Sequence, residues 1–485
     1  MSEMKKYMNF IDGKWVAPST NEYYQNINPA NRDDVIGEYP LSSKQDVDTA
    51  IDSCQKAFKV WSHMLVGERE KIISKFIQLL DENKQKIGEM LTREQGKTFK
   101  EALGEPTRGV VECRYFLGEG QRLEGITMPS DRAGVISVAQ RVPLGVIAAI
   151  APWNFPFLTP LRKIMPALVC GNTVIFKPAF ETPHCGVMIM ELFEQAGLPA
   201  GVVNMVIGKG SVMGDAISNN PLVRGITFTG STAIGQRINE TAAKNFTKVQ
   251  LEMGGKNPCI VANYKNLASA AKQLAGAAYA LAGQRCTSIS RIIVLESQAE
   301  EFEKLLAEET TKFTLGDGMD PKVTIGPVMN QKACEDIMGY IKSARDEGAT
   351  VKVGGSQLKG GIYDKGCWIE PTLITGVTPK MKIAIDEIFG PVLVVLRAKT
   401  FEEAVAMAND TKYGLAAAVF TDDLDKIYTF IQEIDAGMVH INHGTVTDGT
   451  MPFGGVKQSG SGQFSKGKTN KDFFTQFKVV YTKYV

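Results

Sequence analysis

The sequence predicts an α/β fold in which the sheets are largely parallel. Strand-like runs at 145–151 and 173–176 are followed by helix-like segments at 184–196 and 231–244, and this alternation is typical of parallel sheets covered by helices. The chain has 485 residues, enough for roughly three domains at about 150 residues each. Hydrophobic residues make up 44% and charged residues 22%, which is ordinary for a globular protein.

The individual elements follow from hydrophobic periodicity. Helical spacing over 46–61 and 68–91 indicates that the first hundred or so residues are mostly helical. From 135 onward, strands are expected at 135–142, 145–151, 173–176, 202–207, 225–228, 249–253 and 259–262, with helices at 184–196 and 231–244. A second alternating series predicts another α/β domain, with helices at 267–281, 300–312, 331–347 and 401–408 and strands at 290–295, near 351 and at 392–396.

The C-terminal segment 473–485 alternates like a strand but carries apolar residues on both faces. A strand of this kind needs a partner, because an uncovered edge would pair with other chains. We therefore predict that it joins 135–142 in a small oligomerisation sheet.

Charge and cysteine content narrow the functional classes. Lys and Arg total 54 against 53 Asp and Glu, for a net charge of +1, which argues against nucleic-acid and membrane partners. The N-terminus lacks a secretory signal, so we expect a cytoplasmic protein. The eight cysteines are at least 15 residues apart, so they are expected to be reduced, with at most one reactive and the others packed. His440 and His443 lack a recognisable third ligand, so no metal is expected.

Glycine-rich turns between strands and helices indicate a phosphate site. Gly208 begins a turn that resembles GxGxxG but has one residue too many before the third glycine, and alone this is a weak signal. Gly230 and Ser231 lie in a second strand-to-helix turn, where free amides and the helix dipole favour an anion. Two such turns together favour dinucleotide binding over an ordinary Gly-rich loop.

Three polar residues lie at turns or strand ends within otherwise apolar surroundings: Asn154, Glu252 and Cys286. Each also has an ordinary interpretation, as a turn residue, a solvated charge and a buried thiol respectively. A thiol, a carboxylate and an amide are the groups that covalent catalysis, proton transfer and oxyanion binding require.

Seven motifs occur in order along nearly the whole chain: PWNFP, KPA, FTGS, LEMGGKNP, GQRC, EIFGPV and PFGGVKQSG. Together they resemble the NAD(P)-dependent aldehyde dehydrogenase superfamily, and most of all its α-ketoglutarate semialdehyde and succinate semialdehyde members. The resemblance implies a Rossmann-like cofactor domain (1–120 and 144–254) and an α/β catalytic domain (255–455). It also implies a small β oligomerisation element (121–143 and 468–485), and a homodimer or homotetramer.

The resemblance also implies roles for the three polar residues. Cys286 matches the nucleophile, whose thiolate adds to the aldehyde and later carries the acyl group as a thioester. Asn154 matches the side-chain donor to the oxyanion, with the Cys286 backbone N–H as second donor. Glu252 matches the base that activates water to hydrolyse the thioester.

The cofactor positions carry over in the same way, and they imply NAD or NADP. Lys177 matches the lysine that binds the adenosine ribose, Gly230 and Ser231 the pyrophosphate turn, Glu387 and Phe389 the nicotinamide side, and Trp153 lies beside the cofactor. Many NAD-specific members carry Glu three residues after the lysine, whereas this chain has Phe180, with Glu181 one residue later. Loss of that repulsive carboxylate predicts that NADP also binds, with the preference open.

Two arginines indicate an acidic substrate. Arg162 lies eight residues beyond Asn154, and semialdehyde dehydrogenases resemble this chain in carrying arginine at that position. Arg285 is adjacent to Cys286. A guanidinium group can hold a carboxylate with two hydrogen bonds, although Arg162 could instead pair with a protein carboxylate. The expected substrate is α-ketoglutarate semialdehyde, succinate semialdehyde or a sulfonated aldehyde such as sulfolactaldehyde, with neutral aldehydes as the alternative.

Two other functional classes remain open. In a CoA-acylating relative a thiol takes the acyl group instead of water, and Glu252 argues for water because acylating members commonly lack this base. A non-catalytic protein that kept the fold is the second alternative, and the intact set of Cys286, Glu252 and Asn154 argues against it.

Overall fold

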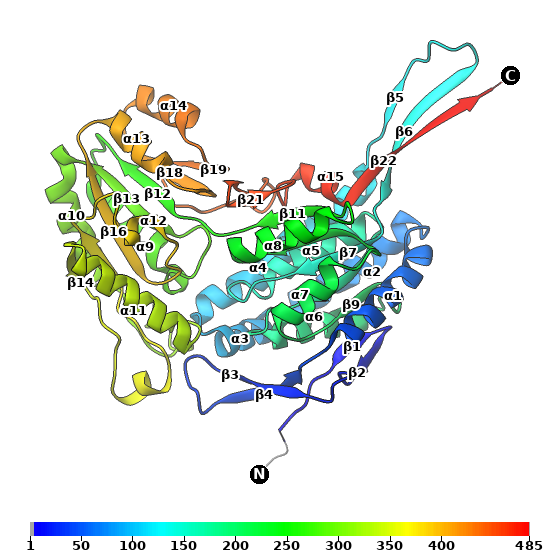
Figure 1. The fold of residues 1–485 in the computed structure, drawn as a ribbon, viewed down its shortest axis with the longest axis horizontal. Helices are drawn as coiled ribbons and strands as arrows, with labels where there is room; N and C mark the ends of the chain where they lie inside the picture. Colours follow the sequence, from blue (N-terminus) through cyan, green and yellow to red (C-terminus); the bar gives the residue numbers. More distant parts are fainter. Residues whose placement is uncertain (1–3, 485) are drawn as a thin grey trace.

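Two large sheets form the framework of the protein, and each lies in its own lobe (Figure 1). The computed structural model describes residues 4–484. The first sheet has the strand order β2-β1-β9-β8-β7-β10-β11-β21, and neighbours among β7 to β11 are parallel. Its strands are β1 (Asn9–Ile11), β2 (Lys14–Val16), β7 (Val146–Ile150), β8 (Thr173–Lys177), β9 (Val203–Met205), β10 (Val223–Thr229), β11 (Lys248–Glu252) and β21 (Gly460–Ser461).

Helices cover both faces of this first sheet because its strands are apolar on both sides. In β7, Ile147 and Ala149 pack with helices α2 to α6, whereas Val146, Ala148 and Ile150 pack with α1, α7 and α8. The helices are α1 (Lys44–Trp61), α2 (Val66–Glu82), α3 (Lys84–Gln95), α4 (Phe99–Glu119), α5 (Leu158–Val169), α6 (Pro183–Gln195), α7 (Gly210–Ser218) and α8 (Thr232–Ala243).

The start of the chain corrects one expectation. Residues 9–40 form four short strands instead of continuing the predicted helices: β1, β2, β3 (Tyr23–Ile27) and β4 (Val35–Pro40). These strands of three to six residues are too short for a period of two to be evident in the sequence. The helices expected from 46 and 68 are present as α1 and α2, but α2 ends at Glu82 and a separate helix α3 begins at Lys84.

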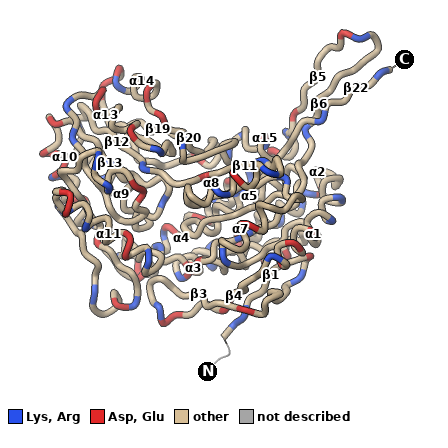
Figure 2. Tube along the Cα trace, in the orientation of Figure 1, with Lys and Arg blue, Asp and Glu red and all other residues tan. Residues whose placement is uncertain are grey.

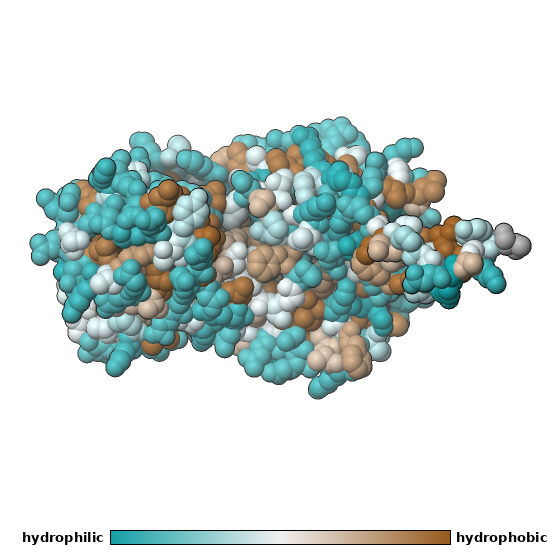
Figure 3. All heavy atoms as spheres, turned by 90° about the horizontal axis from the view of Figure 1, so that it is seen from above, coloured by the Kyte–Doolittle hydropathy of each residue, from teal (hydrophilic) through white to brown (hydrophobic). Residues whose placement is uncertain are grey.

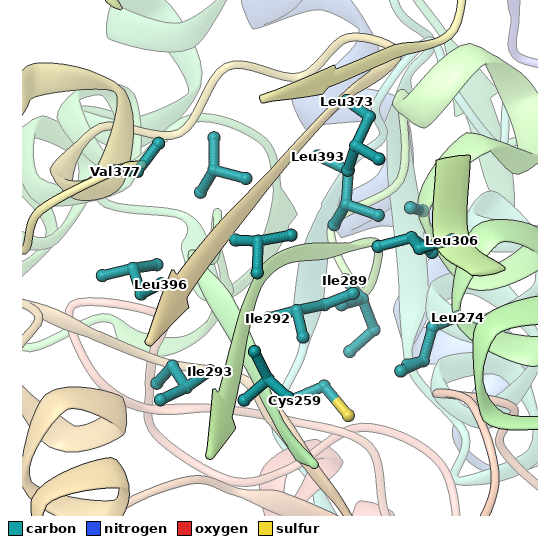
Figure 4. Packing of buried hydrophobic residues seen from close by; sticks show 14 of the residues in the cluster. Cys259, Leu274, Ile289, Ile292, Ile293, Leu306, Leu373, Val377, Leu393 and Leu396 are labelled. Carbon is teal, nitrogen blue, oxygen red and sulfur yellow. The ribbon is translucent and has the colours of Figure 1, made fainter. Parts of the chain in front are cut away.

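The second lobe is built on a seven-stranded sheet of order β14-β15-β16-β13-β12-β18-β19, in which only β14 is antiparallel to its neighbour. Its strands are β12 (Asn257–Val261), β13 (Ile289–Leu295), β14 (Thr350–Val353), β15 (Thr372–Thr375), β16 (Val392–Ala398), β18 (Ala416–Phe420) and β19 (Met438–Ile441). Its helices are α9 (Leu267–Tyr279), α10 (Glu296–Thr310), α11 (Gln331–Asp346), α12 (Lys382–Ile385), α13 (Phe401–Asn409) and α14 (Leu424–Glu433). Figure 4 shows its core, where Ile292 and Leu393 from the strands meet Leu274 and Leu306 from the helices.

A narrow arm projects from the first lobe and ends near the C-terminus (Figure 1). It consists of β5 (Ile126–Met128), β6 (Val135–Pro143) and β22 (Thr475–Lys483), and β22 pairs antiparallel with β6 from Thr475↔Pro143 to Lys483↔Val135. The short helix α15 (Lys471–Phe474) leads into β22, and a small ribbon pairs β17 (Tyr413–Gly414) with β20 (Val456–Lys457). The two segments expected to form one sheet therefore pair within the chain.

The arm exposes several large apolar side chains, which appear among hydrophilic ones in the space-filling view (Figure 3). They are Ile126, Met128, Ile136, Phe477, Val479, Val480, Tyr481 and Tyr484. Positive and negative residues are interspersed along the rest of the chain, with no large region of one sign (Figure 2). No helix among residues 4–484 combines the length and the apolar character needed to cross a bilayer.

Candidate active site

The first sheet brings most of the predicted site residues to one edge. Five adjacent parallel strands, β9, β8, β7, β10 and β11, end at this edge, and the chain reverses its direction of progression between β7 and β10, where open α/β sheets bind ligands. The predicted residues that lie at or just beyond these strand ends are Gly208, Lys177, Trp153, Asn154, Gly230, Ser231 and Glu252.

The second sheet contributes the remaining residues from the opposite ends of its strands. Cys286 precedes β13, and Glu387 and Phe389 precede β16. Contacts join the two sets: the Asn154 side-chain amide donates to the Gln284 carbonyl (3.0 Å), and the Gly255 N–H donates to Glu387 Oε1 (3.0 Å). The Trp153 and Phe389 rings meet edge to face at 5.5 Å. The structure therefore places the residues from both lobes around one site.

The loop that carries Cys286 is tightly held. The Asn257 side-chain amide donates to the carbonyls of Cys286 (2.7 Å) and Ser288 (2.8 Å). Immediately upstream, Leu281, Ala282 and Gly283 have left-handed backbones with φ of 58°, 53° and 69°, a conformation that costs non-glycine residues of order 1–3 kcal/mol. A Cβ at Gly283 would lie 2.0 Å from the Gly390 carbonyl oxygen, so this position requires glycine.

The surroundings of Cys286 keep its thiol protonated in the free protein. Burial raises the pKa of Cys286 to about 12, with further contributions from the negative charges of Glu252 and Glu387 and an opposing effect of Arg285. A buried neutral thiol needs a base to become nucleophilic, and Glu252 is suited to that role.

Glu252 is itself held by two hydroxyl groups. Thr229 Oγ1 donates to Oε2 (3.2 Å), and Ser465 Oγ donates to Oε1. Both partners fix the orientation of a carboxyl group that is only 6% exposed. Ser465 was not identified from the sequence, because nothing in its local pattern connects it with a residue more than two hundred positions earlier.

Asn154 is fixed by a buried ion pair that the sequence did not indicate. Its backbone carbonyl accepts a hydrogen bond from Lys97 Nζ (2.8 Å), and Lys97 is paired with Glu105 on α4. Glu105 Oε2 in turn accepts from the backbone N–H groups of Phe157 (3.1 Å) and Leu158 (2.9 Å), where α5 begins. These contacts stabilise the turn that presents the Asn154 amide.

The cofactor residues fit an anionic dinucleotide. Ser231 is the N-cap of α8 but its side chain makes no capping bond, so N–H groups of the first turn are available to a phosphate. A Cβ at Gly230 would lie 2.5 Å from the Phe228 ring. Lys177 is buried and donates to the Pro178 carbonyl (2.8 Å); burial lowers the pKa of Lys177 to about 8, against the opposing charge of Glu181.

The two predicted substrate arginines differ. Arg162 makes two hydrogen bonds to Glu112, from Nε and Nη2, both 2.7 Å long. It therefore pairs with a protein carboxylate, which was the alternative to binding the substrate. Among residues 4–484, the Arg285 guanidinium donates one hydrogen bond, to Thr287 Oγ1 at 3.3 Å. Arg285 thus keeps most of its N–H donors for a ligand. Arg162 uses Nε and Nη2 to bind Glu112 and has fewer donors to offer.

Two further cations lie close to Arg162 and were not identified from the sequence. Arg108 donates to the Thr447 carbonyl (2.7 Å), and Lys466 Nζ donates to the Asp448 carbonyl (2.8 Å). Burial and, after it, the positive charge of Arg162 together lower the pKa of Lys466 to about 8. Clustered cations that disfavour one another's charge favour an anion between them.

The two clustered histidines and the other cysteines lie outside the group of predicted catalytic residues. The rings of His440 and His443 meet edge to face at 5.0 Å, and no cluster of three or more metal-ligating side chains occurs within residues 4–484. Seven cysteines were expected to be packing residues only. All seven are buried, and the sulfur of Cys367 also accepts a hydrogen bond from Arg32 Nη2 at 2.8 Å.

Comparison with known sequences agrees with this geometry. The profile of the aldehyde dehydrogenase family matches residues 15–480. The chain is 40% identical to an α-ketoglutaric semialdehyde dehydrogenase of Bacillus subtilis, across 100% of this chain and 99% of the relative. It is 36% identical to the mitochondrial succinate-semialdehyde dehydrogenase of Arabidopsis thaliana, across 99% of this chain and 90% of the relative.

Solved structures show the same fold. A 3,6-anhydro-L-galactose dehydrogenase in complex with NAP superposes with a TM-score of 0.96 at 34% identity, covering 98% of this chain and 100% of that one. Betaine aldehyde dehydrogenase from Staphylococcus aureus in complex with NAD+ gives a TM-score of 0.95 at 34% identity, covering 98% and 94% of the two chains.

Proposed function

This chain belongs to the aldehyde dehydrogenase family, and we propose that it oxidises a small acid-bearing semialdehyde to the carboxylic acid with NAD or NADP. The observation that carries the proposal is the hydrogen bond from Asn154 to Gln284. It joins the turn after β7, which carries Asn154, to the loop that carries Cys286, and so supports the assignment of Asn154 as the oxyanion donor for a nucleophilic Cys286. Glu252, whose charge raises the pKa of Cys286, completes the set.

In the first half of the proposed reaction, Glu252 accepts the Cys286 proton, directly or through a water molecule. The thiolate attacks the carbonyl carbon of the aldehyde and gives a thiohemiacetal. One N–H of the Asn154 amide is bonded to Gln284, and an amide has two, so the second can donate to the oxyanion together with the Cys286 backbone N–H. Such a donor contributes about 3–4 kcal/mol to transition-state stability.

NAD or NADP, held by Lys177, the Gly230–Ser231 turn, Glu387 and Phe389, would supply the hydride acceptor for the second half. Loss of the hydride from the thiohemiacetal would leave the acyl group on Cys286 as a thioester. Glu252 then removes a proton from water, and the resulting nucleophile attacks the thioester carbonyl. The Cys286 thiolate departs, and the carboxylic acid is released. Ser465 and Thr229 orient the carboxylate of Glu252 for this step.

The substrate class follows from the cations near the thiol. Arg285 adjoins Cys286 and has free donors, and Arg162, Arg108 and Lys466 add positive charge nearby. A carboxylate on the far end of the aldehyde suits this environment, as in α-ketoglutarate semialdehyde or succinate semialdehyde. A sulfonated aldehyde such as sulfolactaldehyde offers the same charge.

A substrate panel tests this proposal. Purified protein is given matched acidic and neutral aldehydes, and reduction of NAD or NADP is followed by absorbance. We expect the acidic aldehydes to give a kcat/KM at least about tenfold higher, the value of one charge-assisted hydrogen bond. Comparable values for neutral aldehydes of the same length would overturn the choice of substrate class.

Product analysis separates hydrolysis from CoA acylation, the second candidate function. Glu252, held by two hydroxyl groups, favours water as the final acceptor. We expect the free acid with or without CoA. An acyl-CoA product whose formation requires CoA would establish the alternative.

The cofactor site supports the use of both NAD and NADP. Phe180 occupies the position of the carboxylate that would repel a 2′-phosphate, and its ring stacks on Tyr24 at 4.0 Å. We expect the kcat/KM values for NAD and NADP to differ by less than about a thousandfold, roughly 4 kcal/mol. A larger ratio in either direction would contradict this expectation.

The arm supports a homodimer or homotetramer. Its exposed apolar side chains form a surface that is unfavourable in water, and a second copy of the chain would cover it. Light scattering at micromolar concentration tests this proposal, and a monomer would contradict it. The assignment of 1–120 and 144–254 to the cofactor and of 255–455 to catalysis stays a prediction.

A further inference from the structure

One side of α4, at the start of the helix, contacts the backbone of both lobes near the candidate active site. Glu105 accepts hydrogen bonds where α5 begins, and Lys97, just ahead of the helix, donates to the Asn154 carbonyl. Glu101 lies midway between them in the sequence, so it faces the same side as Glu105. Its Oε1 accepts a hydrogen bond from the backbone N–H of Leu281, in the second lobe, at 2.8 Å. The same end of α4 therefore holds a backbone group on each side of the site.

The other carboxylate oxygen of Glu101 is bound by the helix itself. Oε2 accepts from the backbone N–H (3.1 Å) and the hydroxyl (2.8 Å) of Thr98, the N-cap of α4. Thr98 Oγ1 in turn accepts from the Glu101 N–H (3.4 Å), which is the reciprocal arrangement of a capping box. Because these bonds fix Oε2, the carboxylate is oriented with Oε1 toward Leu281.

Leu281 begins a turn that needs support from its surroundings. Leu281, Ala282 and Gly283 all have left-handed backbones, and such conformations in non-glycine residues persist only where neighbouring structure imposes them. The Leu281 carbonyl accepts from the backbone N–H and from Nε2 of Gln284, both at 3.1 Å. Leu281 is only 4% exposed, so loss of Glu101 Oε1 would leave its N–H buried without an acceptor, which destabilises the turn.

Gln284 connects this turn to the predicted catalytic residues. Its backbone carbonyl accepts from the Asn154 amide at 3.0 Å, and Cys286 follows two residues later. Its side-chain Oε1 accepts from the Met329 N–H at 2.8 Å. A movement of Leu281 would therefore move Gln284, and with it the position of the Asn154 amide relative to Cys286.

The segment that leads into α4 is packed closely against the second lobe. The Phe99 N–H donates to the Gly318 carbonyl (2.8 Å). A Cβ at Gly326 would lie 1.9 Å from the Gly96 carbonyl oxygen, and a Cβ at Gly318 would lie 2.6 Å from the Lys97 carbonyl oxygen. No side chain fits between these backbones, so Glu101 extends from a rigid base.

We propose that Glu101 is a positioning residue, which holds Leu281 and thereby the loop of Cys286 in register with the Asn154 amide. The roles of Cys286 and Asn154 in this proposal rest on the proposed function. The contact between Glu101 and Leu281 needs no ligand, so it can be tested separately from the reaction.

The charge of Glu101 offers a different explanation that the test has to separate. Burial lowers the pKa of Arg285, and the negative charge of Glu101 is among the effects that oppose it. Glu101→Asp keeps the charge and the capping box, since Asp46 fills the same place in the capping box of α1, but it is too short to reach Leu281 as well. Glu101→Gln keeps the length and an acceptor oxygen and removes the charge.

Amide hydrogen exchange of the full chain, read by mass spectrometry without substrate or cofactor, tests the contact. Glu101→Asp should speed exchange in peptides covering 281–286 by about tenfold or more, because the turn opens more often. Glu101→Gln should exchange there like the parent. Thr98→Val, which removes the capping hydroxyl but leaves the Leu281 bond, is the matched control and should change exchange in the first turn of α4 alone. Parent-like exchange of 281–286 in Glu101→Asp would overturn the proposal.

Steady-state kinetics with an aldehyde that the parent oxidises test the consequence. Glu101→Asp should lower kcat by about tenfold to a hundredfold with a smaller change in KM, the cost of a small misplacement of reacting groups. Glu101→Gln and Thr98→Val should stay close to the parent. A defect in Glu101→Gln that is absent from Glu101→Asp would assign the effect to charge and overturn the proposal.

A double-mutant cycle tests whether Glu101 acts through the register of the two groups. If Glu101→Asp already displaces Cys286 from the Asn154 amide, Asn154→Ala should lower kcat less in that variant than in the parent. Losses that multiply independently would overturn the proposal. A parent that oxidises no aldehyde would contradict the proposed function, whereas hydrogen exchange would still decide whether Glu101 holds the turn at Leu281.

Discussion

The two sheets contribute to the candidate site from opposite ends of their strands. The first sheet presents Asn154 and Glu252 at the carboxyl ends of β7 and β11, and the second presents Cys286 and Glu387 ahead of the amino ends of β13 and β16. The rule that α/β sheets bind ligands at carboxyl ends therefore describes the first sheet only. The second sheet supplies a rigid loop, held by Asn257 and by a left-handed turn.

This difference suggests a division of labour. In the proposed mechanism, the second sheet carries the atom that forms the covalent bond, while the first carries groups that stabilise or move charge around it. Substitution of Cys286 should then abolish the reaction, whereas substitutions in the first sheet should slow particular steps and leave others measurable.

The largest effect is expected for the nucleophile. Cys286→Ala should lower kcat by roughly 10⁴-fold or more, because no covalent intermediate can form. Steady-state reduction of NAD or NADP measures this loss, and equilibrium binding of the cofactor should persist as the control for folding. Residual turnover within a hundredfold of the parent would assign the nucleophile elsewhere.

Glu252→Gln tests the contribution of the first sheet. The variant should lower kcat by about 10²–10⁴-fold, the range for loss of a general base. Because Glu252 also accepts the Cys286 proton in the proposed mechanism, rapid mixing should show that the first equivalent of reduced cofactor forms more slowly as well. A first equivalent formed at the parent rate would limit Glu252 to the hydrolysis of the thioester.

Asn154→Ala should reduce kcat by about 10²–10³-fold, with a smaller change in KM, because the amide acts on charge that develops in the transition state. Lys97→Met provides a sharper comparison. It removes the ammonium group that holds the Asn154 carbonyl and should lower kcat in the same direction but less. If Lys97→Met lowered kcat more than Asn154→Ala in a folded protein, positioning could not be its only role.

The two arginines separate substrate binding from support of the fold. Arg285→Leu should raise KM for an acidic aldehyde by about tenfold to a hundredfold, the value of a charge-assisted hydrogen bond, and change KM for a neutral aldehyde little. Arg162→Leu leaves Glu112 buried without its partner, so it should lower the melting temperature and affect both aldehydes. A stable Arg162→Leu protein with a defect for acidic aldehydes alone would reverse this assignment.

The smallest effect concerns the pH dependence of the thiol. Since burial raises the pKa of Cys286 to about 12, its thiolate fraction should increase about tenfold per pH unit between pH 7 and pH 9. Glu387→Gln removes a negative charge that contributes to this rise and should increase the alkylation rate at pH 7 by several-fold. Rates that do not depend on pH would show that the thiol is already ionised.

Local sequence patterns predicted much of this architecture and less of the site. Periodicity identified α1 and α8, the Gly197-Leu198-Pro199 stop identified the end of α6, and the motifs identified Cys286, Glu252 and Asn154. The supporting contacts were not predictable. Glu112, Lys97 and Ser465 act on residues 50 or more positions away, and no local pattern encodes such distances. The pairing of Cys367 with Arg32 was missed for the same reason.

The position of Ser465 has a consequence for the order of assembly during synthesis. Ser465, which bonds Glu252, leaves the ribosome after Cys286, as do β21, which pairs with β11, and β22, which pairs with β6. Domains can fold while the chain is still being made, and contacts between residues far apart in sequence form slowly. Nascent chains that already contain Cys286 therefore lack the hydroxyl that holds Glu252 until Ser465 has been synthesised as well.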